Sequence, residues 1–567
     1  MTSSTETASR RLLPAAHALA LLYLLAGIAA MWWLSPRVPY ADGWRFLGHF
    51  LQAPFPHDIL APDNGHHEVL PNAVRVLELH VFGAGQWLQV AAGIALALAT
   101  VLVFARGIRG VVDVRAKAAA LLAVVLGLFW LGNIRALAHG NESVHAYCVT
   151  LFLAIGLHVL SKARTGRGGI VDAAIAAACG LAAAFSFGSG FACFVAFAAL
   201  LLLQRAPWRQ WAVLVAGLLA TLVLLRLDGG TGASIAIAPL RQGEMLLRWL
   251  CGPFVYAAWP LLDPQIASQL PIAAARAPAL AVAQAYEGAF GPVLLARWPQ
   301  LLFGLAGLGW LAALGWRAWR DRESVTLSAL MGIGLACFAA AVGVMIATVR
   351  LDYFTTHPDQ LLAPRYVVWS SLFWGGLLLA TAAQARRPAR ALLAAVLVAI
   401  ALLPSQLWMA RLGGNMQAVA GQTGLAAAVG VVEADLPLGE TVFEDLAAAL
   451  PPARAAGVAV FAWPETRWLG RRPEADALRL LEARDLEVTV VDNRLDAHGR
   501  GRRVRFALGD VPANRLLLLD DDGTVRGLAM RDREDGRWIG WMRGAGHEPP
   551  RVAAAVGPPS RQERRSP

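Results

Sequence analysis

The sequence predicts an α-helical polytopic membrane protein of about eleven transmembrane helices, followed by a soluble α/β domain. Of its 567 residues, 57% are hydrophobic and only 16% are charged, whereas soluble domains carry about 25% charged residues. Long apolar runs recur between residues 13 and 409, and basic residues punctuate them. After residue 410 the pattern changes to short segments with helical or alternating spacing, which is typical of a small mixed domain.

Eleven apolar runs are long enough to cross about 30 Å of hydrocarbon. They cover residues 13–35, 86–105, 117–133, 144–161, 169–186, 190–204, 210–227, 299–316, 325–349, 366–385 and 391–409. The fifth and sixth runs are the weakest, and they predict either two spans or a tilted or re-entrant pair. The apolar stretch LLRWLCGPFVYAAWPLL is predicted to lie in the interface or to line a groove, because a twelfth span there would invert every later loop.

The distribution of basic residues predicts the orientation. With the N-terminus inside, every short inner connection carries at least two Lys or Arg residues, as the positive-inside rule requires. We therefore expect a multi-pass protein of a bacterial-type cytoplasmic (inner) membrane, with a periplasmic C-terminal domain. The expected parts are a transmembrane domain 1–410 with outer loops 36–85, 228–298 and 350–365, an extracytoplasmic domain 411–548, and a disordered tail 549–567.

Within the C-terminal domain, helical spacing in TGLAAAVGVVEADLP and PEADALRLLEARD predicts two helices. GVAVFAW and NRLLLLD are among the segments that predict strands. The net charge of +11 does not indicate nucleic-acid binding, because the chain has no basic patch with interleaved aromatic residues.

The first outer loop holds the most informative polar residues. It begins SPRVPYADGWRFLGHF, which places Asp42 and Arg45 just beyond the first span. Asp42 is suited to act at the lipid–water boundary, and the competing interpretation is that it caps a helix beginning at Gly43. The loop continues as DNGHHEVLPNAVR (63–75). It has no HExxH pattern, which weakens the case for a divalent metal site. The alternative is that these side chains contact the substrate or are solvated. The candidates there are Asn64, His66, His67 and Glu68.

Two further outer segments carry candidate substrate-binding residues. GNIRALAHGNESVHAY (132–147) contains Arg135, Asn141 and Glu142, and RLDYFTTHPDQLLAPRYVVW (350–369) contains Arg350, Arg365 and Tyr366. At the outer start of a span, a guanidinium such as that of Arg365 can bind a phosphate in the headgroup layer or serve as an interfacial anchor.

Together these segments resemble the GT-C class of integral membrane glycosyltransferases. Asp42 in YADGW matches the acidic residue that the class carries in its first outer loop. Asn64, His66 and Pro71 keep the spacing of an NxHRxxxPR-like element, although His67 and Asn72 replace its two arginines. AAFSFGSGFACFVAFAALLL resembles the small-residue turn between two middle spans of the class, and APRYVVWSSLFW resembles its late Arg-Tyr helix start. The resemblance covers residues 13–409.

The resemblance implies transfer of a sugar, with inversion, from a polyprenyl-phosphate donor to an extracytoplasmic acceptor, which is a glycan, a lipid or a protein. Asp42 is then the general base, and Arg350 and Arg365 stabilise the departing phosphate. Some members of the class use a divalent cation such as Mg²⁺ or Mn²⁺ and others do not. The implied partners are the lipid-linked sugar, the acceptor and membrane lipids.

Two other functions fit the same topology. A transporter or flippase of a lipid-linked glycan accounts for the many spans. Such proteins usually carry ionisable or broken sites at mid-membrane, whereas the charges of this sequence lie in its outer loops, which disfavours transport. A polymerase or ligase of a lipid-linked polysaccharide also faces outward and releases phosphate.

Overall fold

The computed structural model describes residues 2–63, 65–162, 169–227, 237–270, 272–496, 499–533 and 535–556. Internal packing divides the chain into two units, which we call the helical unit and the sheet unit. The helical unit comprises Met1–Ser35, Leu60–Asn72 and Val90–Gly413, and the sheet unit comprises Pro36–Ile59, Ala73–Gln89 and Gly414–Pro567. This division follows packing alone and leaves the predicted domain boundaries a prediction.

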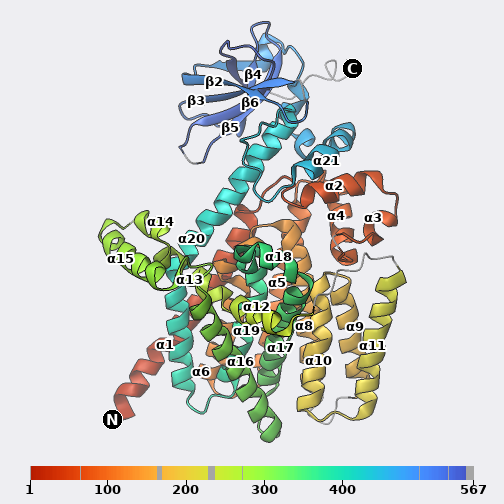
Figure 1. Ribbon diagram of the computed structural model, residues 1–567, viewed down its shortest axis with the longest axis vertical. Helices are drawn as coiled ribbons and strands as arrows, with labels where there is room; N and C mark the ends of the chain where they lie inside the picture. Colours follow the sequence, from red (N-terminus) through yellow and green to blue (C-terminus); the bar gives the residue numbers. More distant parts are fainter. Residues whose placement is uncertain are drawn as a thin grey trace. The chain divides into compact units, whose positions relative to one another are not determined.

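The fold class predicted from the sequence is confirmed: the chain combines apolar helices long enough to cross a membrane with a C-terminal β-sheet region (Figure 1). The helices of the helical unit, two of which run on into the other unit, are α1 (Thr2–Trp33), α5 (Trp87–Ile108), α6 (Val114–Phe129), α7 (Ile134–Leu137), α8 (Gly140–Lys162), α9 (Ile170–Ala184), α10 (Ala192–Leu203), α11 (Trp208–Leu227), α12 (Pro239–Leu250), α13 (Gly252–Leu262), α14 (Pro264–Ser268), α15 (Ala273–Phe290), α16 (Arg297–Arg320), α17 (Leu327–Val349), α18 (Leu351–Thr356), α19 (Pro364–Ala383) and α20 (Pro388–Val429).

Among the described residues, ten helices are long and apolar enough to span a membrane. Nine of them correspond to nine of the eleven predicted runs. The other two runs became α9 and α10, which have 15 and 12 residues and reach only about 22 and 18 Å at 1.5 Å per residue. The short 3₁₀ helix η3 (Gly188–Phe191) joins them, so the alternative of a tilted or re-entrant pair matches their length.

The tenth helix that passes this test is α21 with the turn after it, in the predicted C-terminal domain. Its apolar face is buried in the core of the sheet unit through Leu446, Ala449 and Ala453. The apolar stretch of the 228–298 loop forms α12 and α13, which are bent by 58° at one break and together could make an eleventh span or a re-entrant loop.

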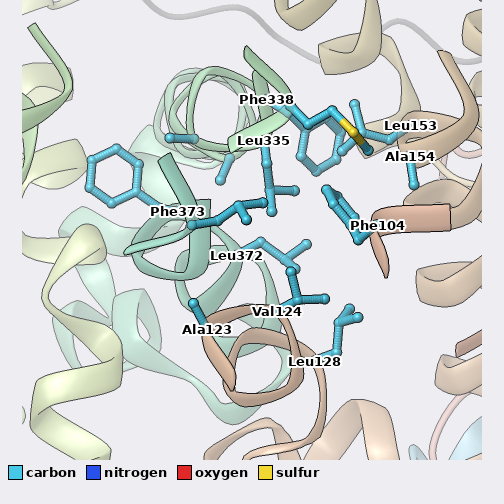
Figure 2. Packing of buried hydrophobic residues seen from close by; sticks show 14 of the residues in the cluster. Phe104, Ala123, Val124, Leu128, Leu153, Ala154, Leu335, Phe338, Leu372 and Phe373 are labelled. Carbon is cyan, nitrogen blue, oxygen red and sulfur yellow. The ribbon is translucent and has the colours of Figure 1, made fainter. Parts of the chain in front are cut away.

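The core of the helical unit lies where α5, α6, α8, α17 and α19 meet (Figure 2). Phe104, Leu128, Leu153, Phe338 and Leu372 point into it from these five helices. Because glycines line the seams, the helices approach closely. An added Cβ on Gly375 of α19 would lie 3.3 Å from the Cα of Gly127 on α6. Such small-residue contacts allow apolar helices to pack by van der Waals contact in a membrane.

The described residues of the sheet unit form helices and one antiparallel sheet (Figure 1). Its elements are α2 (Gly43–Gln52), α3 (His57–Leu60), α4 (Val69–Phe82), α21 (Phe443–Ala456), β1 (Leu478–Leu481), β2 (Arg484–Asp492), β3 (Arg500–Ala507), β4 (Arg515–Leu519), β5 (Val525–Arg531), β6 (Trp538–Arg543) and β7 (Arg551–Ala555). The strand order is β1-β7-β4-β5-β6-β3-β2. Leu517 packs in one apolar cluster and Leu516 and Leu518 in another, so β4 is buried on both faces. This explains its unbroken apolar run.

Three local predictions for the C-terminal domain were wrong. PEADALRLLEARD forms the short 3₁₀ helix η7 (Ala475–Ala477) and strands β1 and β2 instead of a helix. GVAVFAW forms the 3₁₀ helix η5 (Ala459–Ala462) and its flanking residues instead of a strand. The stretch 549–567, expected as a disordered tail, begins with β7, which pairs with β1 and β4. Residues 557–567 lie outside the described residues.

Candidate functional site

Asp42 stands immediately before α2, where a capping residue would stand, but it does not cap the helix. Its side chain accepts no capping hydrogen bond from the first turn, and its backbone is helical, with φ −59° and ψ −15°. Instead the carboxylate lies 3.1 Å from Arg45 Nη1, with 45% of the side chain exposed. The interpretation of Asp42 as a plain helix cap is therefore wrong.

The turn before Asp42 is fixed by the segment that leads into α21. Ala41 has a φ of +51°, a left-handed conformation that non-glycine residues rarely adopt. Its N–H donates to Thr441 Oγ1 at 3.0 Å. The N–H of Glu440 donates to the Tyr40 hydroxyl at 3.3 Å. These contacts hold the strained turn and thereby set the position of the carboxylate of Asp42.

Arg45 also binds a carboxylate that the sequence did not point to. Its Nη1 atom lies 3.2 Å from Asp445 Oδ2 in the first turn of α21. Two carboxylates, those of Asp42 and Asp445, therefore share one guanidinium. Asp445 is separated from Arg45 by 400 residues, and no local pattern marks it. A divalent cation between the two carboxylates would have to displace Arg45, so these residues do not fit a metal ion.

In the helical unit, His66 is held in a tight turn against the loop between α9 and α10. Asp63 and His66 form an isolated antiparallel bridge, and Gly65 between them has a φ of +78°. Asn64 lies outside the described residues. The ring of His66 lies 4.6 Å from that of Phe187, centroid to centroid. An added Cβ on Gly188 would lie 2.5 Å from His66 Nδ1, so the glycine of the SFGSG segment makes room for the imidazole.

The electrostatic surroundings of His66 disfavour its charged form. Burial lowers the pKa of His66, the positive charges of His145 and Arg350 lower it further, and Glu68 and Asp63 oppose this. The imidazole is thus kept neutral near pH 7. This also shows that three of the predicted residues, His66, Glu68 and Arg350, lie within electrostatic reach of one another.

A buried chain of charged side chains runs beside His66. Arg135 Nη2 lies 3.4 Å from Glu142 Oε1, and His145 Nε2 lies 3.1 Å from Glu142 Oε2. His145 Nδ1 lies 3.6 Å from Glu68 Oε2. The His145 ring stacks on Phe187 at 4.2 Å, with the ring planes 4° apart. Phe187 therefore contacts both imidazoles, a role that its place in an apolar run did not reveal.

The remaining predicted residues are placed as follows. His67 and Asn141 are buried, and His67 lies edge-on to Phe185. Arg365, in the first turn of α19, is half-buried, lies 5.0 Å from the Tyr366 ring centroid and donates to Gln360 Oε1 at 3.5 Å. Arg350 follows α17 and is half-buried.

The structure therefore brings the predicted residues together in two groups. Asp42 and Arg45 form one group in the sheet unit. Glu68, Arg135 and Glu142 form the other through contacts in the helical unit. Within the described residues, no group of three or more His, Cys, Asp and Glu side chains could hold a metal ion.

No family model and no curated protein matches the chain. Solved structures that are similar to it include the oligosaccharyltransferase of Archaeoglobus fulgidus in complex with zinc and sulfate, at 14% identity and a TM-score of 0.35, covering 72% of this chain and 55% of that chain. The oligosaccharyltransferase AglB of the same organism, in complex with an inhibitory peptide and a dolichol-phosphate, is similar at 12% identity and a TM-score of 0.33, covering 73% and 58%.

ArnT from Cupriavidus metallidurans in the apo state is similar at 15% identity and a TM-score of 0.35, covering 84% of this chain and 93% of that chain. The chain thus spans less than two thirds of the two oligosaccharyltransferase chains that it matches.

Proposed function

We propose that the chain is a membrane glycosyltransferase of the GT-C kind, which transfers a sugar from a polyprenyl-phosphate donor to an extracytoplasmic acceptor. One observation carries the proposal: Asp42 occupies a capping position without capping, and its carboxylate stays half-exposed beside Arg45. A carboxylate held by a cation but open to solvent can accept a proton from an acceptor hydroxyl. The resemblance of the YADGW segment to the first outer loop of that class supports the same role.

In the proposed reaction, the carboxylate of Asp42 takes the proton of the acceptor hydroxyl as its oxygen attacks the anomeric carbon. The bond from that carbon to the phosphate oxygen breaks, and the polyprenyl phosphate leaves with the electron pair. Attack from the side opposite the phosphate inverts the anomeric configuration. Each acceptor thus gains one sugar, and the proton ends on Asp42.

The leaving phosphate needs positive charge. We propose that Arg350 and Arg365 supply it, because both are half-buried and therefore still accessible. Arg365 lies in the first turn of α19, where the helix dipole also favours an anion. His66, kept neutral by its surroundings, can donate or accept a hydrogen bond there. No step is assigned to a metal ion, since Asp42 and Asp445 are both engaged by Arg45.

The buried candidates have a different proposed role. Arg135, Glu68, Asn141 and His67 each expose at most 5% of their surface, which leaves little area for a substrate. We propose that they and Glu142 hold the wall on which His66 rests. They are positioning residues, and they act on the substrate only through the residues that they support.

The proposed location follows from the basic residues. Positively charged connections between the spans support an inside location of the N-terminus. In a bacterial-type cytoplasmic membrane, the 36–85 loop with Asp42 would then lie on the outer side. Polyprenyl-linked donors suit this location, because the lipid keeps the sugar at the membrane surface.

The test is transfer of radiolabelled sugar from polyprenyl phosphate to an envelope extract by the purified protein in lipid vesicles. Asp42→Asn and Asp42→Ala are expected to lose transfer by at least about 100-fold, as removal of a general base does, while they insert and purify normally. Asp510→Asn, which changes a fully exposed aspartate of the same unit, is expected to keep full activity. Full activity of both Asp42 variants would disprove the role of this residue.

A second candidate is a transporter or flippase of a lipid-linked glycan. The broken pair α12 and α13, with its 58° bend, favours it, since discontinuous helices form the binding sites of many transporters. The two functions are separated in sealed proteoliposomes. Movement of labelled lipid-linked glycan across the bilayer without chemical transfer would support the transporter.

A further inference from the structure

A cavity of about 390 Å³ lies between α2 and α21 in the sheet unit. Sites for small molecules measure about 300–1,000 Å³, so the cavity can hold one or two sugar rings. Four polar side chains and Trp44 line it together with small residues. The polar side chains are those of Arg45, His49, Gln52 and Asp445.

Small residues make the hollow. The cavity is lined by Gly48 on α2, by Ala53 directly after α2, and by Ala448 and Ala449 on α21. The two helices approach closely at one point, where an added Cβ on Gly48 would lie 3.5 Å from the Cα of Ala449. Beside this contact, the short side chains leave the space unfilled. The cavity is therefore encoded by residue size on both helices.

Two lining residues have polar atoms that need a partner. Trp44 is fully buried, and neither its Nε1 atom nor His49 Nε2 has a hydrogen-bond partner among the described residues. A buried donor without a partner costs about 1–3 kcal/mol. Both atoms are closed to solvent, so a ligand hydroxyl reaches them only after the two side chains turn.

The charges of the cavity wall disfavour an anion. Arg45 and Asp445 both line the cavity and lie 3.2 Å apart, so their charges offset each other. Asp42 is not part of the lining, but it contacts the same Arg45 Nη1 atom at 3.1 Å. A phosphate would have to compete with these two carboxylates for the guanidinium. Hydroxyl groups suit the same wall, because they donate to carboxylates and accept from a guanidinium.

We infer that this cavity binds the acceptor, and that the bound part of the acceptor is neutral and rich in hydroxyl groups, as a sugar unit of a glycan is. The inference rests on the proposed glycosyl transfer and assigns it an acceptor class. Arg45 connects the cavity wall to Asp42, so a hydroxyl bound in the cavity is brought next to the proposed base. The donor phosphate is assigned to Arg350 and Arg365 instead.

The first experiment fills the cavity. Ala448→Trp places an indole in it, whereas Ala455→Trp places one at an exposed position of the same helix outside the lining. With an envelope glycan extract as acceptor, the KM of Ala448→Trp for the extract is expected to rise at least tenfold, with its KM for the lipid-linked donor unchanged. The control is expected to match the wild type. An unchanged acceptor KM in Ala448→Trp would overturn the inference.

The second experiment does not depend on catalysis. In Ala448→Cys, labelling of the introduced thiol by a small maleimide is followed with and without water-soluble oligosaccharides released from the same envelope by mild acid. The oligosaccharides are expected to slow labelling of this thiol at least fivefold, and to leave labelling of the Ala455→Cys control unchanged. Equal labelling with and without them would overturn the cavity assignment.

The two experiments also separate the inference from the proposed function. Protection of the thiol in Ala448→Cys by a protein that transfers no sugar would keep the glycan site and refute the transferase. Transfer that depends on Asp42 but ignores Ala448→Trp would keep the transferase and refute the site.

Discussion

Replacing Glu78 by alanine is expected to loosen the start of the second long helix. Glu78 lies in α4, is fully buried, and accepts hydrogen bonds from the N–H groups of the first three residues of α5. Its Oε1 atom binds the N–H of Trp87 at 3.2 Å, and its Oε2 atom binds those of Leu88 at 2.5 Å and Gln89 at 3.2 Å. A side chain from a neighbouring helix thus provides the N-terminal cap that α5 lacks in its own sequence.

The magnitude follows from these three bonds. The Gln89 bond is buried, and an orphaned buried N–H costs about 1–3 kcal/mol. The bonds of Trp87 and Leu88 are partly buried, so water can replace part of each, at a cost of about 0.5–1 kcal/mol. We therefore expect Glu78→Ala to cost about 3 kcal/mol in the local free energy of opening.

Glu78→Gln is expected to cost less, about 1 kcal/mol, because the amide oxygen can still accept from the helix. Burial raises the pKa of Glu78 above its ordinary value of 4.5, although the bonds from Leu88, Gln89 and Trp87 oppose this. A raised pKa means that the carboxyl stabilises the fold most below pH 4.5 and less as the pH rises through the folded-state pKa. The difference in the local free energy of opening between Glu78→Gln and the wild type should therefore become smaller from pH 4 to pH 7.

Hydrogen exchange of the backbone amides measures the local free energy of opening at the start of α5 directly. A loss of about 3 kcal/mol corresponds to roughly 100-fold faster exchange at Leu88 and Gln89. Glu482→Ala, at an exposed position of the same unit, is the matched control and should leave these amides protected. If Glu78→Ala exchanges no faster than the wild type at both amides, the capping argument fails.

Three further outcomes are expected. Gly188→Ala should displace His66, because its Cβ would stand 2.5 Å from the imidazole; we expect at least a tenfold loss of sugar transfer, and wild-type activity would show that the imidazole position is unimportant. Burial lowers the pKa of His66, so the stability that depends on its neutral form is complete above pH 6.5 and decreases below it. The melting temperatures of the wild type and of His66→Gln, measured from pH 5 to pH 8, should therefore converge towards low pH. Arg135→Met leaves Glu142 without its 3.4 Å partner and should destabilise the helical unit by about 3–5 kcal/mol, whereas a melting temperature equal to that of the wild type would contradict a stabilising pair.

The long helices could be predicted from the sequence because a membrane span needs a continuous apolar run, which is a local property. The two runs that fell short, 169–186 and 190–204, are joined by the SFGSG turn, and an added Cβ on Gly188 of this turn would meet His66. That contact joins residues more than a hundred positions apart. Hydropathy carries no information about it.

The secondary structure of the C-terminal elements was harder to predict because it depends on their tertiary contacts. PEADALRLLEARD has helical spacing, yet Leu478–Leu481 pairs with β7, and the sheet overrides the weak helical preference. In the same way, the sequence pointed to Asp42 and Arg45 but not to Asp445, their partner across 400 residues. Asp42 was found because a charged residue beside a span is conspicuous, and Asp445 was missed because an acidic residue in the first turn of a helix is ordinary.

The strand order has a consequence for biosynthesis. β7 lies between β1 and β4 in the sheet and pairs with both, although it is synthesised after both of them. Until residue 555 has been made, β1 and β4 each present an unpaired edge, and such edges are prone to aggregation. A nascent chain that is stopped before β7 should therefore need protection by chaperones, while its helices are already free to enter the membrane.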